Sequence, residues 1–194
     1  MALLGRRWNT VPDDVPKGNP APPEAVLRSA GLGSGEKVHA AAQDDWDGAW
    51  VLATTWRVVT VGDDGQVQLD RPWLTVDSGS WDPDTYQLGV SWVDGTPVTR
   101  WRLRRSSGPG RLPEALHDRV SASVVLTRHV DLGTGRTARV VIRKDLATRE
   151  LHEQVLVDRA ARPGDTELRD EVARARTEVR SQVGLPPSGT PGDW

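Results

Sequence analysis

The chain contains no cysteine and no phenylalanine, and it has one tyrosine and one methionine. The absence of cysteine excludes disulfide bonds, thiolate chemistry and cysteine-ligated zinc. The longest apolar runs are far shorter than the roughly 20 residues that a membrane span needs, and no apolar stretch of signal-peptide length follows the N-terminus. We therefore expect a soluble, cytoplasmic protein without a membrane span.

Charge of one sign is also lacking, because 25 basic and 27 acidic residues leave a formal net charge of −2. Such a chain has no global field that draws it to nucleic acid or to anionic lipid. Any binding of that kind would require a local basic patch.

Tryptophan is the abundant aromatic residue, and seven of the nine tryptophans fall between Trp46 and Trp101. This stretch has the pattern of successive β-strands, in which every second side chain faces the same side of a sheet. With phenylalanine absent, we expect tryptophan to fill much of the core of a β-structure.

The pattern along the chain predicts four segments. Residues 1–23 are rich in Pro, Asp and Gly and are expected to be disordered. Residues 24–123 are predicted to form a β-rich domain with a closing helix, and residues 124–184 a β-β-β-α unit packed on it. Residues 185–194 are predicted to be a flexible tail.

Helical periodicity and reversals mark the elements within these segments. Asp94-Gly95 separates two β-rich runs, which is typical of a hairpin. Leu112, Leu116 and Val120 recur in steps of four, which predicts one face of a helix that Val124 would extend. A last helix is predicted to begin at Asp165 or Thr166 and to end at Gly184, and the residues expected on its apolar face are Leu168, Val172, Ala175, Val179 and Val183.

The stretch WVLATTWRVVTV, residues 50–61, resembles the second and third strands of bacterial PH-like and GRAM-type domains, and PWLTVDSGSW resembles the strand that follows. The resemblance covers about residues 36–124. It implies an α+β fold with an antiparallel PH-like β-barrel or sandwich and a closing helix, here followed by the β-β-β-α unit. The composition, rich in Arg, Val, Asp and Gly, is similar to that of high-GC actinobacterial proteins.

The chain departs from the family in the loop that joins the first two strands. Members that bind phosphoinositides carry basic residues there, whereas this chain has Asp44, Asp45 and Asp47. We therefore do not expect phosphoinositide binding, and within the family a protein or peptide partner is favoured.

Motifs that would indicate catalysis or a cofactor are weak. The DDWDG loop lacks the spacing of a calcium loop, and Asp82 and Asp84 flank a proline in a pattern typical of a turn. Neither glycine-rich run has the form of a phosphate loop. We expect no enzyme, no catalytic residue, no cofactor and no metal, with an unrecognised hydrolase and convergence of the four histidines left open; these histidines are His39, His117, His129 and His152.

The function expected from the sequence is a non-catalytic adaptor that recognises a protein or peptide partner, with the oligomeric state left open. The speculative partner-binding residues are Trp46, Trp81, Arg100, Arg102 and Arg104. The alternative is a weak nucleic-acid binder that uses the arginine-rich strand, with nearby tryptophans stacking on bases. A second basic cluster would add to such a surface if it faced the same way, and it contains Arg136, Arg139, Arg143 and Lys144.

Overall fold

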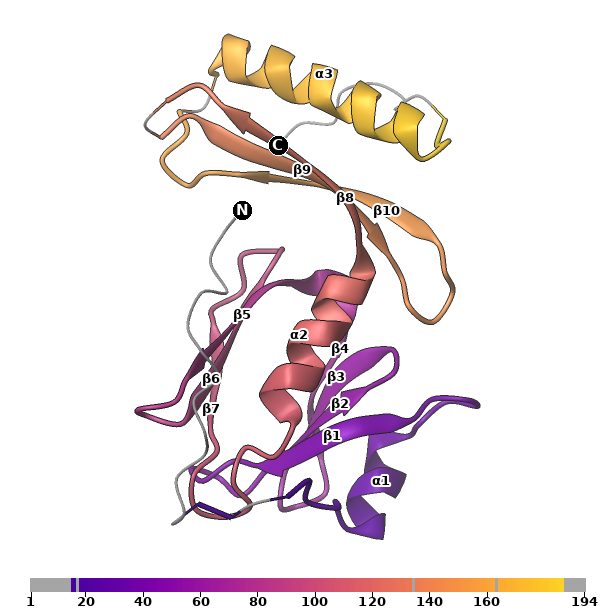
Figure 1. Cartoon of the computed structure of the whole chain (residues 1–194), viewed down its shortest axis with the longest axis vertical. Coiled ribbons are helices and arrows are strands. Elements are labelled where there is room, and N and C mark those ends of the chain that lie inside the picture. Colours follow the sequence, from indigo (N-terminus) through magenta and orange to yellow (C-terminus); the bar gives the residue numbers. More distant parts are fainter. Residues whose placement is uncertain (1–14, 17, 134, 163, 187–194) are drawn as a thin grey trace. The chain divides into compact units, whose positions relative to one another are not determined.

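The structure is a computed structural model that describes residues 15–186 except 17, 134 and 163. Most of the predicted disordered segment and most of the predicted C-terminal tail lie outside the described residues. The chain divides into two compact units, residues 1–121 and residues 122–194. Two sheets lie in the first unit and one sheet lies in the second, among the described residues (Figure 1).

The first unit opens with a short helix, α1 (Glu24–Ala30), and a four-stranded antiparallel sheet in the order β1-β2-β3-β4. Gly31 ends α1 in the left-handed conformation, with φ of 55°. The strands of the sheet are β1 (Val38–Gln43), β2 (Trp50–Thr54), β3 (Arg57–Val61) and β4 (Val67–Pro72).

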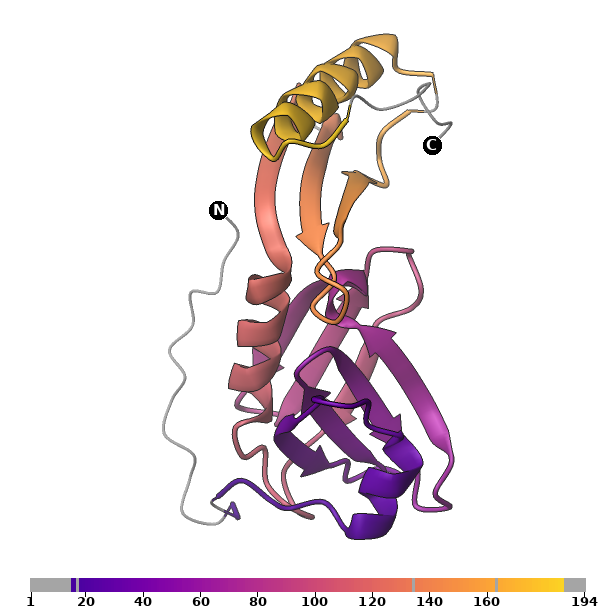
Figure 2. The same ribbon diagram turned by 90° about the vertical axis from the view of Figure 1, so that its right-hand side faces the viewer.

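A 3-10 turn, η1 (Trp73–Thr75), leads into a second antiparallel sheet in the order β5-β6-β7, and then to helix α2. Gly79 lies under α2 so closely that a methyl group there would overlap the side chain of Leu116. Figure 2 shows α2 running beside the sheets of this unit. The elements are β5 (Val76–Asp82), β6 (Gln87–Trp92), β7 (Thr99–Arg102) and α2 (Leu112–Ser123).

Both faces of the four-stranded sheet carry buried side chains. On one face, Leu52 and Val59 are fully buried in a cluster that Val26 of α1 covers. On the other face, Val51 and Val58 are also fully buried. Strands covered on both sides are expected to be nearly continuous in apolar residues, and β2 and β3 have that composition.

Tryptophan fills much of the remaining core of the first unit, as the sequence predicts. Trp73 is fully buried and its indole Nε1 donates to the carbonyl oxygen of Thr54 at 2.9 Å. Trp101 and Leu88 lie opposite one another on the inward face of the second sheet, and both are buried. The buried indole that needs a partner therefore has one, which is the usual condition for burying tryptophan.

Arg57 connects α1 to the four-stranded sheet. Its Nε lies 3.0 Å from Oε1 of Glu36, and its guanidinium also donates to the carbonyl oxygen of Ala30 at 3.0 Å and pairs with Asp70. The carboxylate of Glu36, nearly buried, accepts a further hydrogen bond from Oγ1 of Thr54 at 2.5 Å. Thr54 and Arg57, on either side of the turn between β2 and β3, therefore both bind the carboxylate of Glu36.

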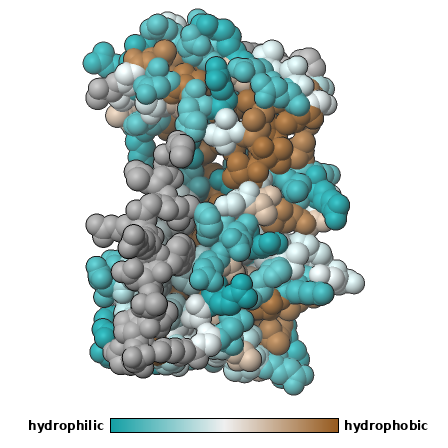
Figure 3. All heavy atoms as spheres, in the orientation of Figure 1, coloured by the Kyte–Doolittle hydropathy of each residue, from teal (hydrophilic) through white to brown (hydrophobic). Residues whose placement is uncertain are grey.

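The second unit is a three-stranded antiparallel sheet, in the order β10-β9-β8, with helix α3 across one face (Figure 1). Hydrophobic side chains gather over this sheet below the helix (Figure 3). The elements are β8 (Val124–Asp131), β9 (Thr137–Lys144), β10 (Leu151–Val157) and α3 (Thr166–Gln182). The buried core residues are Val130, Ala138, Val140, Ile142, Leu168, Val172, Ala175 and Val179.

Helix α3 is fixed by a cap and by ion pairs. Asp165 is its N-cap, and its Oδ1 accepts from the backbone N–H of Leu168 at 3.0 Å. Glu153 of β10 accepts from Nε of Arg176 at 2.6 Å and from Nη1 of Arg180 at 3.2 Å. Charged side chains of α3 thus also hold the helix to its sheet.

The expected α+β class is confirmed, since the described part of the chain has three antiparallel sheets and three α-helices. The barrel is not found there, because the strands form open sheets. Pro72, which has no backbone N–H to donate, and the turn η1 separate β4 from β5. The extension of the α2 face to Val124 is also wrong, because Val124 begins β8 and is exposed.

Candidate partner-binding surface

The DDWDG loop between β1 and β2 is closed by its own backbone. The N–H of Asp44 donates to the carbonyl oxygen of Ala49 at 2.8 Å, and the N–H of Gly48 donates back to the carbonyl oxygen of Asp44 at 3.0 Å. Asp47 Oδ1 accepts from the N–H of Ala49 at 3.0 Å. One acidic side chain of the loop therefore stabilises a tight reversal, as its turn-like sequence predicts.

The other two carboxylates bind backbone N–H groups at the end of β7. Asp44 Oδ1 accepts from Arg102 at 2.8 Å. Asp45 accepts from three consecutive residues, from Arg104 and Ser106 at 2.8 Å and from Arg105 at 2.9 Å. Successive N–H groups that converge in this way form a nest for an anion, and here the anion is an aspartate of the same chain.

The two neighbouring carboxyls have opposite pKa shifts. Burial raises the pKa of Asp44, and the charges of Asp47 and Asp45 add to this increase, while two backbone hydrogen bonds oppose it. Burial also acts to raise the pKa of Asp45, but the hydrogen bonds from Ser106, Arg105 and Arg104 outweigh it, so this pKa is lowered. In the DDWDG loop, the fold therefore disfavours the ionised form of Asp44 and favours the ionised form of Asp45.

Trp46 follows these two carboxylates and its side chain is exposed. It is 56% exposed, while Trp73, Trp92 and Trp101 are buried. Its backbone N–H donates to Asp44 Oδ1 at 3.3 Å, and the N–H of the preceding Asp45 donates to the carbonyl oxygen of Arg102 at 2.7 Å. An exposed indole is thus presented on a backbone that is fixed against β7.

The arginines of β7 lie on the outward face of the second sheet. Arg100 is opposite Gly89 and Arg102 is opposite Gln87, and this face alternates with the buried face that contains Trp101. Strand β7 therefore has one buried face and one face toward solvent. Within the part of the chain that the structure describes, the guanidinium groups of Arg100, Arg102 and Arg105 make no ion pair or hydrogen bond.

Arg104 and Trp81 belong to a different cluster, around Tyr86. The Arg104 guanidinium lies over the Tyr86 ring, 5.3 Å from its centre, and the Trp81 ring stands edge-on to Tyr86 at 6.0 Å. Trp81 pairs with Leu88 on the inward face of the sheet and is half-buried. The structure therefore places the loop that contains Trp46 beside the backbone of Arg102, whose side chain shares a face of β7 with that of Arg100. Trp81 and Arg104 pack around the tyrosine instead.

The second basic cluster does not form a continuous basic stripe. Arg136 binds Asp165 and Glu167, each at 2.7 Å, and Arg143 is buried with its Nη1 2.9 Å from Ser123 Oγ. Their proximity in sequence does not put their side chains on one exposed face.

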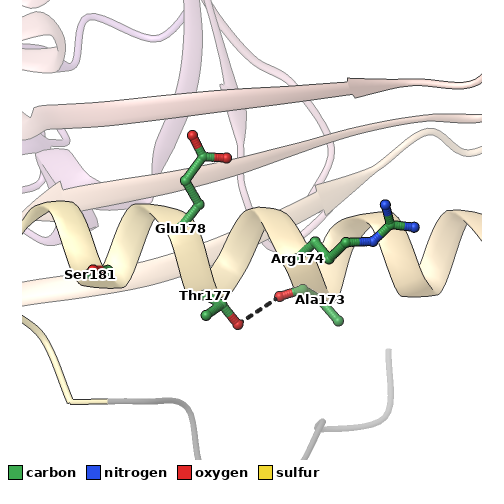
Figure 4. Close-up of a pocket in the computed structure, with 5 residues that line it drawn as sticks. All are labelled: Ala173, Arg174, Thr177, Glu178 and Ser181. Atoms are coloured by element: carbon green, nitrogen blue, oxygen red, sulfur yellow. Dashed lines mark hydrogen bonds between the residues drawn. The ribbon is translucent and has the colours of Figure 1, made fainter.

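A shallow depression of about 550 Å³ lies on α3 (Figure 4). Ala173, Thr177 and Ser181 follow one another along the helix, and Thr177 Oγ1 donates to the carbonyl oxygen of Ala173 at 3.1 Å. Its two charged residues pair elsewhere, Arg174 with Glu171 and Glu178 with Arg128. The depression therefore has neither an activated nucleophile nor an unpaired charge.

The structure also bears on metal binding, on the paired carboxylates and on membrane-spanning helices. Among the described residues, no three His, Asp or Glu side chains gather as a metal would require. The acidic pair Asp82 and Asp84 is a turn, in which Asp82 Oδ1 accepts from the N–H of Asp84 at 2.9 Å. Across the same residues, no helix has the length and apolar character to cross a membrane.

Comparisons with protein-family models, with curated proteins and with solved structures find no match to this chain. Sequence reasoning missed the contact between Asp45 and the N–H groups of residues 104–106. No charge pattern in the sequence points to it, because the contacts run to backbone N–H groups about 60 residues away along the chain.

Proposed function

We propose that the chain is a non-catalytic cytoplasmic adaptor that recognises a protein or peptide segment. The binding site is the Trp46 surface, which we define as Trp46, Arg100, Arg102 and Arg105. The observation that carries the proposal is the exposed indole of Trp46 on a loop that Asp44 and Asp45 fix to β7.

The energetics of exposed tryptophan support this site. Tryptophan and arginine are the residues most enriched among those that dominate binding energy at protein interfaces. A loop that is already held by hydrogen bonds loses little conformational freedom on binding, so less of the contact energy is offset. Both conditions meet at the Trp46 surface.

A PH-like architecture for residues 24–123 is part of the proposal. It is supported by the order of elements, a four-stranded antiparallel sheet, then a three-stranded one, then helix α2. Because its sheets are open, the architecture that we propose is a sandwich and not a closed barrel. The acidic loop between β1 and β2, where phosphoinositide-binding members carry basic residues, supports a protein or peptide ligand.

Recognition through side chains fits the Trp46 surface better than the backbone pairing that many sheet edges support. Strand β7 is an edge strand, but at Arg102 both its N–H and its carbonyl oxygen are engaged, by Asp44 and Asp45. A partner strand therefore cannot pair along this end of β7 without displacing the loop.

The test is selection of binding peptides from a display library of random 12-residue sequences on the full chain. We expect Trp46→Ala to weaken the selected peptides about tenfold or more, equivalent to about 1.4 kcal/mol. The matched control is Val125→Ala, which shortens another exposed hydrophobic residue, 44% exposed, in the second unit. Selected peptides that bind the Trp46→Ala variant as tightly as the natural chain would show that the site is wrong.

A nucleic-acid binder is the second candidate, and it is favoured by the guanidinium groups of Arg100 and Arg102, which have no partner within residues 15–186 as the structure describes them. It predicts a gel shift with a single-stranded oligonucleotide that weakens steeply with salt and is lost when Arg100, Arg102 and Arg104 are replaced by Glu. If the oligonucleotide is not bound even at low salt, this candidate is eliminated.

A further inference from the structure

The charges at the Trp46 surface are unequally presented to solvent. Asp44 is 4% exposed, and its carboxylate accepts from the N–H groups of Arg102 and Trp46. Both oxygens of Asp45 are engaged by three further N–H groups. The two acids on the N-terminal side of Trp46 are thus directed to the backbone, while Asp47 on its other side is exposed.

The cations face the other way. Arg100 and Arg105 are exposed and Arg102 is half-buried, and none of the three guanidiniums has a partner among the described residues. Elsewhere in the chain arginines are commonly paired, as Arg57, Arg136 and Arg176 are. At the Trp46 surface, three arginines close together in sequence are thus without such a partner among the described residues.

Two further acids lie near these cations. Asp47 is in the same loop, where its Oδ1 accepts the N–H of Ala49, and Asp82 is on the outward face of β5, where its Oδ1 accepts from the next turn. Neither forms an ion pair with Arg100, Arg102 or Arg105. The surface therefore offers a partner an exposed indole and three arginines that have no ion pair among the described residues.

We propose that the segment bound at the Trp46 surface is an acidic peptide, whose carboxylates pair with Arg100, Arg102 and Arg105 and whose apolar side chain packs on Trp46. This inference rests on the proposed function and specifies the chemistry of its partner. Guanidinium and carboxylate form paired hydrogen bonds that are stronger than those between neutral groups. Charge complementarity selects the partner, and the indole contributes the apolar contact.

The experiment uses the peptides selected on the full chain and sequences the enriched pool. We expect enriched peptides to carry net negative charge and at least one large apolar residue. Replacing Arg100 and Arg105 together by Glu should weaken their binding about tenfold, and binding of the natural chain should fall as NaCl is raised. Replacing the peptide glutamates by Lys should restore binding to the Glu variant.

Two variants control for folding and for net charge. Arg100→Gln with Arg105→Gln removes the cations without adding repulsion, and it should give a smaller loss in the same direction. Arg159→Glu reverses an exposed arginine of the second unit and should leave binding unchanged. Far-UV circular dichroism and thermal unfolding identify any variant that fails to fold. If the Glu variant does not fold, peptide binding to the Arg100→Gln, Arg105→Gln variant is the test.

The outcomes separate the inference from the proposed function. If the selected peptides are neutral or basic, and their binding is weakened by Trp46→Ala but not by the arginine replacements, the acidic partner is wrong and the adaptor function stands. Peptides that do not depend on Trp46 overturn both. A single-stranded oligonucleotide that binds more tightly than any peptide, through the same arginines, overturns the inference in favour of nucleic acid.

Discussion

Asp44 and Asp45 are neighbours in one loop, yet the fold shifts the pKa values of their carboxyl groups in opposite directions. Asp44 is a buried carboxylate with a raised pKa, and Asp45 fills a nest of three backbone N–H groups that lowers its pKa. The same chemical change at the two positions should therefore have opposite consequences.

We expect Asp45→Asn to lower the free energy of unfolding at pH 7 by about 1–3 kcal/mol, because an amide NH₂ would face backbone donors that now bind both oxygens. Asp44→Asn should change it by less than about 0.5 kcal/mol or increase it, since the amide oxygen still accepts and a buried charge is removed. Urea unfolding followed by circular dichroism measures both. Equal losses at the two positions would contradict the assigned environments.

Glu36 makes stability depend on pH. Burial acts to raise its pKa, but the hydrogen bonds from Arg57, Thr54 and Gly33 outweigh burial, so the folded-state pKa lies below the ordinary value of 4.5. The ionised carboxylate therefore stabilises the fold fully above about pH 5, and this contribution is lost as the pH falls through the folded-state pKa.

We expect the difference in unfolding free energy between the natural chain and Glu36→Gln to be large at pH 7 and to narrow steadily below pH 4.5. Urea titrations at several pH values measure it. The control is Glu24→Gln, which removes an exposed pair with Arg28 and should cost less than about 0.5 kcal/mol throughout. If this difference in unfolding free energy became larger below pH 4.5, the fold would not favour the ionised form of Glu36.

At the scale of elements, α3 is held to its sheet by polar contacts as well as by its apolar face. The side chain of Glu153 is 8% exposed and binds two arginines of the helix that are themselves 18% exposed. Removing one member of such a group leaves the other charges without a partner in a mostly dry environment.

We expect Glu153→Ala to lower the stability of the second unit by about 1–3 kcal/mol, measured as the loss of helical signal on heating. Glu178→Ala is the matched control, because Glu178 is 46% exposed and its single pair with Arg128 should contribute less than about 0.5 kcal/mol. Similar losses for the two variants would contradict the anchoring role of Glu153.

Elements were predictable where the sequence marks their ends locally. Asp165 caps α3, Gly31 ends α1 and Asp94-Gly95 separates β6 from β7, each through chemistry within a few residues. The candidate surface was only partly predictable. The contact of Asp45 with Ser106 joins residues 61 apart, and the side of the sheet on which Trp81 lies depends on strand register. Neither feature has a local signature.

At the scale of the whole molecule, tryptophan reports on the first unit alone among the described residues. The seven tryptophans from Trp46 to Trp101 all lie there, and the core of the second unit is aliphatic. Fluorescence and circular dichroism therefore observe different parts of the chain.

We expect Leu168→Ala, which leaves a cavity in the core below α3, to destabilise the second unit by about 2–5 kcal/mol. The unfolding transition seen by circular dichroism should broaden or split, while that seen by tryptophan fluorescence stays in place. Replacing Trp194 by Phe removes the tail's contribution to the signal. A parallel shift of both transitions would mean that the two units unfold as one.

The contacts of Arg57 have a consequence for the order in which the chain folds. Helix α1 has seven residues, fewer than the roughly 12 that an isolated helix needs for even marginal stability in water. The carbonyl oxygens at its end, of Ala30 and Gly31, accept hydrogen bonds from a guanidinium that β3 supplies. Helix α1 therefore persists only after the β2-β3 hairpin exists, so it forms late, and its amide hydrogens should exchange with deuterium while those of the sheet remain protected.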